Sequence, residues 1–468
     1  MQIIEIIVFL LIIVILGFLI KYKSIKKNYM KILVVVTLLA FILHVFLENT
    51  RWQIYPLYFS MFLVVIMVYF YIFRFEEFKS GNTSRIITLS LTGFLILLSG
   101  VSSFIFPLYD MPLPRGDFSI GTESFIVVDN DRLELYGEQG NRKIKIQVWY
   151  PAENTDGCDV VPWLEDGRVV AQALARDFGM PSFILNHTEL INSSSYQSAP
   201  ISTNLDEYPV VVISHGWRGF RNLHTDLAEE LASFGYVVIG IDHTYGSVAT
   251  VFSEEEIAYV NLDALPDTDT TSDFLENANT LVNTYAGDIT LTLDELEKMN
   301  VGEIPSIFEG KLDLTSIGLL GHSTGGGADV AVAINDERIK ALIGMDAWVE
   351  PIYETEIEKG LDMPSLFLRS GSWETGDNNI NLYNLIDKSS ESSILYQIDG
   401  TTHYDFSMAY MYSPLTKYLD LTGELDGDYL VSILEEIIVD FFDQNLKKDS
   451  SINTNNMDEI WEDVKKIK

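Results

Sequence analysis

The sequence predicts an α/β fold with a mostly parallel central sheet, preceded by a helical membrane region. Apolar runs dominate the chain up to residue 110, whereas the rest has the mixed composition of a globular domain. In this second part, apolar strand-like runs alternate with helical stretches, which is typical of a parallel sheet covered on both faces. The 468 residues also exceed the roughly 250 to 300 residues of a single core. We therefore expect a membrane region at 1–110, a globular domain at 111–448 and a C-terminal tail at 449–468.

Four stretches of the membrane region are long and apolar enough to span a bilayer, which takes about 20 residues. They cover residues 3–20, 32–47, 54–73 and 86–106. No basic residue precedes the first stretch and no small-residue cleavage site follows it, so we expect it to stay attached rather than to act as a signal peptide. His44 lies inside the second stretch, where we expect a neutral, hydrogen-bonded imidazole.

The loops between these stretches differ in basic residues, and this difference predicts their orientation. The first and third loops should be cytoplasmic, because lysine and arginine concentrate there. These residues are Lys21, Lys23, Lys26, Lys27, Lys31, Arg74, Lys79 and Arg85. The second loop has only Arg51 and the segment after the fourth stretch only Arg115, so both should lie on the outer face. Everything after residue 110 is then expected to be extracytoplasmic.

The formal net charge of −36 is concentrated in the globular part. Residues 1–110 hold nine basic and five acidic residues, which leaves 22 basic against 62 acidic residues beyond them. A surface this acidic repels polyanions and argues against nucleic acid as a partner. Cys158 is the single cysteine, so neither an intrachain disulfide nor a cysteine-based zinc site can form.

The globular part opens with runs at 122–129, 132–137 and 143–151, separated by Asn-Asp and Gly-Asn turn signals, which predict an antiparallel meander. Strands and helices alternate after this meander. Strands are expected at 208–216, 235–242, 316–323, 340–347, 363–370 and 393–400, and helices at 222–233, 273–298, after 323, between 370 and 393, and at 428–447. In such sheets ligands bind beyond the carboxyl ends of the strands, so polar residues directly after a strand are the first site candidates.

Gly321-His322-Ser323-Thr324-Gly325 matches the pattern G-x-S-x-G between a predicted strand and a predicted helix. This is the place of the nucleophile elbow in an α/β-hydrolase fold, where small neighbours let a serine hydroxyl project from a sharp turn. The sequence therefore predicts Ser323 as a nucleophile.

A serine hydroxyl needs a base, and in this fold the chain order is serine, acid, histidine. Of seven histidines only His403 follows Ser323, in a loop after a strand, so it is the predicted base. Asp346 is the favoured acid, because it ends the strand next to the nucleophile strand. Asp377, with Glu374, follows the next strand and remains the alternative. The aspartates that satisfy the chain order are Asp329, Asp336, Asp346, Asp362, Asp377, Asp387 and Asp399.

An oxyanion needs two backbone N–H donors, normally one after the nucleophile and one from the loop after an earlier strand. Thr324 supplies the first candidate. Trp217, at the end of Ser214-His215-Gly216-Trp217, supplies the second, although the same letters also describe a tight turn with a packed aromatic. Asp242 and His243 also follow a strand, but no catalytic step needs them, so we expect them to have a structural or pocket-lining role.

Several blocks of the sequence resemble one family. They are KIKIQVWYPAE, VVVISHGWRGFRNLHTDLAEELASFGYVVIGIDH, GHSTGGG, MDAWVEPI and GTTHYDF. Through them, residues from about 107 to 445 resemble the bacterial relatives of platelet-activating factor acetylhydrolase. The resemblance implies Ser323 as nucleophile, Asp346 as acid and His403 as base, with the N–H groups of Trp217 and Thr324 as oxyanion donors.

The resemblance also implies an ester hydrolase that needs no metal or other cofactor and cleaves short or oxidised acyl chains from glycerophospholipids. Two alternatives stay open. The same three residues could act on non-lipid esters, including polyesters, or the domain could bind a ligand as an envelope sensor without turning it over. The inserted helical region at 162–185 has an apolar periodicity that suits both a lid and a packed element.

Overall fold

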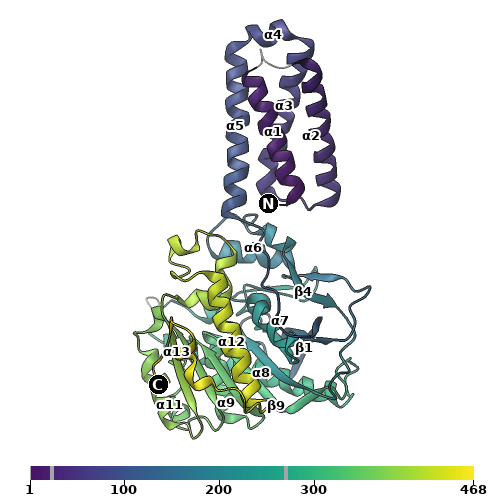
Figure 1. The fold of residues 1–468 in the computed structure, drawn as a ribbon. Coiled ribbons are helices and arrows are strands. Elements are labelled where there is room, and N and C mark those ends of the chain that lie inside the picture. The colour runs from purple at the N-terminus through teal and green to yellow at the C-terminus, as the bar shows by residue number, and fades with distance from the viewer. Residues whose placement is uncertain (1, 22–25, 268–271) are drawn as a thin grey trace. The chain divides into compact units, whose positions relative to one another are not determined.

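The computed structural model describes residues 2–21, 26–267 and 272–468 (Figure 1). Contacts divide the chain into two compact units. The helical unit takes in residues 1–109 with Phe183–Leu190 and Tyr412–Leu415, and the sheet unit takes in the remainder. Lys23, one of the lysines that predict the orientation, lies outside the described residues.

The described part of the helical unit has four helices long and apolar enough to cross a bilayer. They are α1 (Ile3–Ile20), α2 (Lys27–Leu47), α3 (Tyr55–Phe73) and α5 (Asn82–Ile105), with the short η1 (Trp52–Ile54) and α4 (Phe75–Ser80) between them. Each corresponds to one predicted stretch. Helices α2 and α5 begin earlier than predicted, because their polar first turns form helical hydrogen bonds but carry no apolar signal.

Buried charges join the ends of α1, α2 and η1. Arg51 and Glu5 form an ion pair at 2.9 Å, and neither side chain is exposed. The Glu48 carboxylate accepts a hydrogen bond from the Glu5 N–H in the first turn of α1, at 3.1 Å. The His44 imidazole lies between Glu48, 2.9 Å from Nδ1, and the Tyr58 hydroxyl, 2.5 Å from Nε2. The prediction of a hydrogen-bonded imidazole at His44 is therefore confirmed.

The described residues of the sheet unit form one sheet of 11 strands in the order β13-β12-β11-β10-β9-β5-β6-β2-β1-β4-β3. Strands β12 to β6 of this order run parallel to one another, which confirms the predicted fold class. The bounds are β1 (Ser119–Leu133), β2 (Asn141–Ala152), β3 (Val160–Pro162), β4 (Asn192–Gln197), β5 (Tyr208–Ser214), β6 (Val237–Asp242), β9 (Leu312–His322), β10 (Ile339–Met345), β11 (Ser365–Ser370), β12 (Ser393–Ile398) and β13 (Val464–Lys466). Strands β7 (Ala249–Val251) and β8 (Ile257–Tyr259) form a separate pair.

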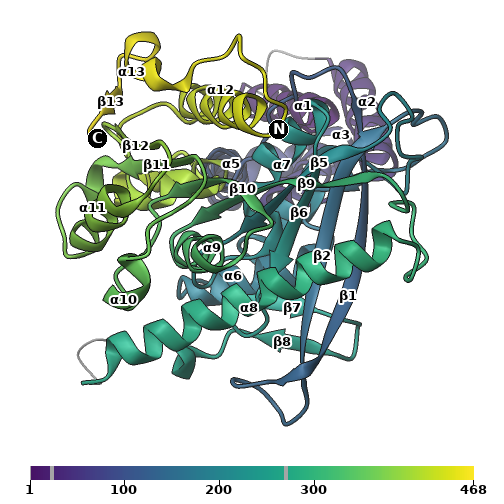
Figure 2. The same cartoon turned by 90° about the horizontal axis from the view of Figure 1, so that it is seen from below.

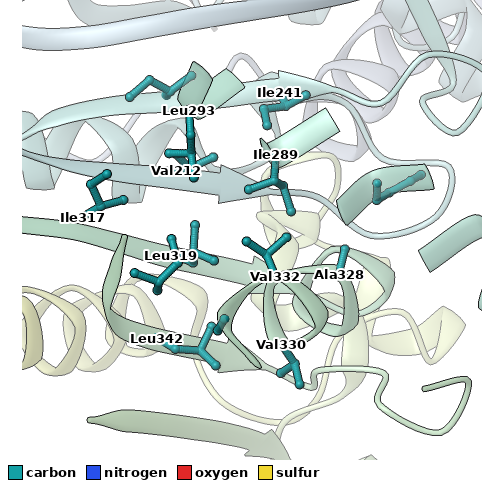
Figure 3. Packing of buried hydrophobic residues seen from close by; sticks show 14 of the residues in the cluster. Val212, Ile241, Ile289, Leu293, Ile317, Leu319, Ala328, Val330, Val332 and Leu342 are labelled. Atoms are coloured by element: carbon teal, nitrogen blue, oxygen red, sulfur yellow. The ribbon is translucent and has the colours of Figure 1, made fainter. Parts of the chain in front are cut away.

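Helices cover both faces of the sheet (Figure 2). Their bounds are α6 (Gly167–Asp177), α7 (Thr225–Ser233), α8 (Phe274–Asn300), α9 (Thr324–Asn335), α10 (Glu354–Ile357), α11 (Asn378–Lys388), α12 (Gly427–Asn445) and α13 (Met457–Ile460). Side chains alternate along each strand, so Val212 and Leu319 join the core under α8 and α9 (Figure 3), while Val211 and Leu320 join the core under α7 and α12. This two-sided burial explains the nearly continuous apolar runs of the central strands.

Two segments differ from the predicted elements. The first predicted run and the first two residues of the second belong to one strand, β1. Asp129 Oδ1 accepts hydrogen bonds from the N–H groups of Asp131 and Arg132, and the expected Asn-Asp turn is an irregularity of this strand. The strand ends at Leu133, so residues 134–137 lie outside it. At the other end, β13 comes from the segment that the sequence set apart as a tail, and it pairs antiparallel with β12.

The inserted helix α6 is anchored at both ends. Before its start, the Trp163 indole is buried, and the Asp166 carboxylate accepts a hydrogen bond from the Arg221 guanidinium at 2.6 Å. At its end, Asp177 accepts one from Arg218 Nε at 2.6 Å. The structure therefore shows α6 as a helix tied to the loop that follows β5.

The buried carboxyl of Asp226, in the first turn of α7, makes a prediction about stability. Burial raises its pKa to about 7, with the nearby Glu229 adding to the rise. Because this folded-state pKa lies above the unfolded value, its contribution to stability is present below the unfolded pKa and is lost as the pH rises through about 7. Asp226→Asn should therefore raise the free energy of unfolding by about 1–2 kcal/mol more at pH 8 than at pH 5.

Thermal melts of the full chain in detergent at both pH values measure this difference. Asp263→Asn is the matched control, since Asp263 is exposed, and it should leave the melting temperature unchanged at both pH values. An Asp226→Asn effect that is equal at pH 5 and pH 8 would contradict the assignment.

Candidate active site

Ser323 occupies the turn between β9 and α9 with φ of 56° and ψ of −122°. A positive φ is uncommon for a residue with a side chain and is held here by the surrounding backbone. The Ser323 N–H donates to Met345 O at 3.0 Å, and its carbonyl accepts from the Trp348 N–H at 2.9 Å. The turn also requires a small neighbour, because a Cβ on Gly325 would lie 2.3 Å from Ser214 O. Ser323 is partly exposed between buried neighbours, as expected for a nucleophile elbow.

Asp346 and His403 meet although 57 residues separate them. His403 Nδ1 lies 3.0 Å from Asp346 Oδ2. The Asp346 side chain is fully buried, and its carboxylate also accepts hydrogen bonds from the Ser370 N–H and the Ser370 hydroxyl, each at 2.7 Å. Three donors thus hold the carboxylate, one of them the predicted base. A neutral imidazole that donates to this carboxylate carries its proton on Nδ1 and has its free lone pair on Nε2.

The residue before the nucleophile contacts the predicted base directly. His322 Nε2 lies 3.0 Å from the His403 carbonyl oxygen, and the two rings are 4.5 Å apart. Burial, with the nearby His403 adding to it, lowers the pKa of His322 well below its usual value. A neutral His322 that faces a carbonyl carries its proton on Nε2 and donates it there. The turn that holds Ser323 and the segment that holds His403 are therefore joined side by side.

The alternative acid lies elsewhere. Glu374 and Asp377 are both exposed, and among the described residues neither makes a hydrogen bond to His403. From the same loop, Ser372 Oγ accepts the His403 N–H at 3.1 Å instead. The geometry favours Asp346 over Asp377 as the acid.

The loop after β5 lies against the nucleophile turn. A Cβ on Gly216 would be only 2.9 Å from Ser323 Cβ. The next N–H along this loop belongs to Trp217, and the first N–H of α9 belongs to Thr324. Among the described residues, neither N–H donates to a backbone oxygen, so both can serve an incoming oxyanion.

Buried side chains fix the shape of this loop. His215 Nδ1 lies 2.7 Å from Gly216 O, and His215 Nε2 lies 2.8 Å from Ser247 Oγ. Burial lowers the pKa of His215 well below its usual value, with the neighbouring His243 adding to the effect. The neutral ring therefore donates through Nδ1 to Gly216 and accepts from the Ser247 hydroxyl. The Arg218 N–H completes the loop by donating to Gly246 O at 2.8 Å.

Gly216→Ala should strongly impair hydrolysis while the protein remains folded. The new Cβ would collide with Ser323 Cβ at 2.9 Å, so either Ser323 or the loop after β5 must shift. A misplacement of this kind costs about 10- to 100-fold in kcat. Gly140→Ala is the matched control, because a Cβ there meets no atom within 4 Å. Initial rates on a p-nitrophenyl ester measure both variants, and equal rates would show that the loop does not constrain Ser323.

Asp242 and His243 are fully buried and bonded within the core. Asp242 accepts the Arg221 N–H at 2.8 Å, and His243 Nδ1 lies 3.1 Å from Asp288 Oδ2. The His243 ring stacks on Tyr285 at 3.8 Å. These contacts indicate the structural role among the two that the sequence allowed.

Three residues that contact the predicted acid and base were not predicted from the sequence. They are Ser370, Ser372 and Trp373, whereas His322 was among the strand-end candidates without an assigned role. Ser370 could have been found, since it is the last residue of a strand and polar residues at that edge are candidates. Trp373 carries no such signal, because its position depends on the course of the loop after β11.

Comparison with known proteins gives a consistent result. The model of a family described as platelet-activating factor acetylhydrolase, isoform II, matches residues 105–464. The platelet-activating factor acetylhydrolase of Cavia porcellus is 20% identical over 364 residues, which cover 73% of this chain and 79% of that protein. The enzyme of the same name from Gallus gallus is 23% identical over 378 residues, 72% of this chain and 84% of its own.

Among solved structures, a ferulic acid esterase from Streptomyces cinnamoneus is similar, with a TM-score of 0.61. The match covers 77% of this chain and 100% of that chain at 21% sequence identity. At this identity the likeness concerns the fold, and it agrees with the mostly parallel sheet described above.

Proposed function

The chain belongs to the platelet-activating factor acetylhydrolase isoform II family, and from this premise we propose that Ser323, Asp346 and His403 form the catalytic triad of an ester hydrolase. Family membership makes the chain a carboxylic ester hydrolase. The observation that supports the specific triad is the 3.0 Å contact between His403 Nδ1 and Asp346 Oδ2, beside the nucleophile turn.

In the first half of the reaction, Ser323 Oγ attacks the ester carbonyl carbon while His403 Nε2 takes the hydroxyl proton. The carbonyl oxygen becomes negative and is stabilised by the N–H groups of Trp217 and Thr324. Asp346 stabilises the imidazolium through Nδ1. When the tetrahedral intermediate collapses, His403 gives its proton to the leaving alcohol, and the acyl group stays on Ser323.

In the second half, a water molecule attacks the acyl carbon and His403 takes one of its protons. Collapse of the second tetrahedral intermediate breaks the bond to Ser323 Oγ, and His403 returns the proton to that oxygen. The products are a carboxylic acid and the free enzyme. The same two N–H groups stabilise both oxyanions.

We propose short or oxidised acyl esters of glycerophospholipids as the substrate class. Two observations support this choice. The relatives share the name platelet-activating factor acetylhydrolase. The chain also carries four helices that are long and apolar enough to cross a bilayer, which would keep the enzyme at a lipid surface.

We further propose that residues after 110 are extracytoplasmic, because lysine and arginine concentrate in the first and third loops of the helical region. An impermeant fluorophosphonate probe on intact cells tests nucleophile and orientation together. Labelling of the intact chain and none of Ser323→Ala would support both. Labelling only after lysis would mean that the residues after 110 face the cytoplasm, while Ser323 would still be supported as the nucleophile.

Substrate profiling separates the remaining alternatives. Preference for a short sn-2 acyl phospholipid over a p-nitrophenyl ester and a soluble polyester fragment would support the lipid substrate. Preference for the non-lipid esters would make the chain a general carboxylesterase. An absence of both labelling and turnover in folded protein would favour a ligand-binding sensor instead.

A further inference from the structure

The imidazole of His403 lies between two other rings. On one side the Trp373 indole is stacked parallel to it, with ring centroids 4.4 Å apart and planes inclined by 3°. On the other side the His322 ring lies at 4.5 Å with an inclination of 36°. The sandwich leaves only about a fifth of the His403 side chain exposed. The indole thus covers one full face of the predicted base.

Buried polar groups hold Trp373 in this place. The residue ends the short helix η5 (Gly371–Trp373), and its carbonyl oxygen accepts a hydrogen bond from Asn379 Nδ2 at 3.0 Å. Asn379 Oδ1 in turn accepts one from Arg369 Nη1 at 2.7 Å, and the side chains of Asn379 and Arg369 are buried. The loop that carries the indole is therefore fixed before any substrate arrives.

The end of β11 and the short loop after it contact both members of the acid–base pair. Ser370 donates to the Asp346 carboxylate, Ser372 accepts the His403 N–H, and Trp373 covers the His403 ring. Because these contacts come from the last residue of β11 and from two residues just after it, a shift of this segment would disturb acid and base together.

The electrostatics of the sandwich suit a positive imidazole. Proton transfer from Ser323 turns His403 into an imidazolium, and an aromatic face within about 6 Å attracts a cation. His322 does not oppose this charge, because burial keeps it neutral. Among the described residues, the titratable groups with a contact to the His403 ring are Asp346, His322 and Tyr404, whose ring centroid is 5.8 Å away.

We propose that Trp373 is a positioning residue for His403, which fixes the plane of the imidazole and stabilises its protonated form through the π face of the indole. The proposal rests on the proposed triad, since it concerns the base of that triad. Removing the π face should weaken the imidazolium in the transition state and lower kcat. It should also make the resting base harder to protonate, so that activity extends to lower pH.

The test compares Trp373→Phe, which keeps an aromatic face, with Trp373→Leu, which keeps only apolar bulk. The full chain in detergent is assayed with p-nitrophenyl butyrate from pH 5 to pH 9. We expect Trp373→Phe to stay within about threefold of the unchanged chain in kcat. Trp373→Leu should lose about 10-fold in kcat with little change in KM, and the acid limb of its kcat/KM profile should move about half a pH unit lower.

A Trp373→Leu variant with the same kcat and the same acid limb as Trp373→Phe would overturn the proposal. It would show that the indole only packs against His403. Trp373→Met serves as a second non-aromatic variant if the leucine variant melts early. The pH dependence of fluorophosphonate labelling gives a readout that does not depend on the chosen ester. Failure of the triad itself is recognised separately, because Ser323→Ala would then still turn over substrate or take up the probe.

Discussion

Ser323→Ala is expected to lower kcat/KM for p-nitrophenyl butyrate by roughly 10⁴-fold or more. The reason is the loss of the proposed nucleophilic oxygen, so that catalysis falls to what the oxyanion donors and substrate binding can supply. The backbone of the turn is held by its own N–H and carbonyl contacts rather than by the hydroxyl, so the variant should fold. Steady-state rates together with thermal melts measure both points.

Ser392→Ala is the matched control for this experiment. Ser392 is exposed just before β12, at the amino end of a strand, whereas the site lies at the carboxyl ends. Its removal should leave kcat/KM unchanged. Turnover that persists in Ser323→Ala but disappears in another serine variant would show that the other serine is the nucleophile.

Asp346→Asn should reduce kcat by about 10³- to 10⁴-fold with a smaller change in KM. An amide can present its NH₂ group to Nδ1, which favours the imidazole tautomer with its proton on Nε2 and removes the base. The amide also cannot balance the charge of the imidazolium. Both losses act on the chemical step, so steady-state kinetics on a soluble ester should show the effect in kcat.

Asp377→Asn tests the alternative acid with the same chemical change. Asp377 is exposed at the start of α11, so we expect kcat within about twofold of the unchanged chain. A large loss of kcat in Asp377→Asn, with a small loss in Asp346→Asn, would show that Asp377, in the loop after β11, is the acid.

Much of the fold could be predicted because its signals are local. Runs such as the one in β5 are apolar up to the final Ser214, since strands buried on both faces have no polar side. The strand β1 was divided in the prediction because an Asn-Asp pair usually marks a turn, whereas here the Asp129 side chain satisfies the neighbouring N–H groups within a strand. The segments 183–190 and 412–415 join the helical unit through tertiary contacts, which no local pattern encodes.

The site residues were predicted from their order in the chain and from their positions at the ends of strands. The structure brings Asp346 and His403 together and places Gly216 against Ser323. Their catalytic roles stay predictions until the variants are measured. The residues that were missed act through loops. Ser372 and Trp373 contact His403, and the loop that holds them is fixed by buried contacts such as the hydrogen bond from Asn379 to the Trp373 carbonyl oxygen.

The short strand β13 has a consequence for the integrity of the sheet. Tyr396, Gln397 and Ile398 of β12 pair with it, so it covers one outer margin of the sheet. A chain shortened before Val464 would leave that margin bare, with a row of unpaired backbone donors and acceptors beside the apolar side chains of β12. Such an open edge recruits strands from other molecules, so loss of these few residues would favour intermolecular aggregation even though every catalytic candidate remained in place.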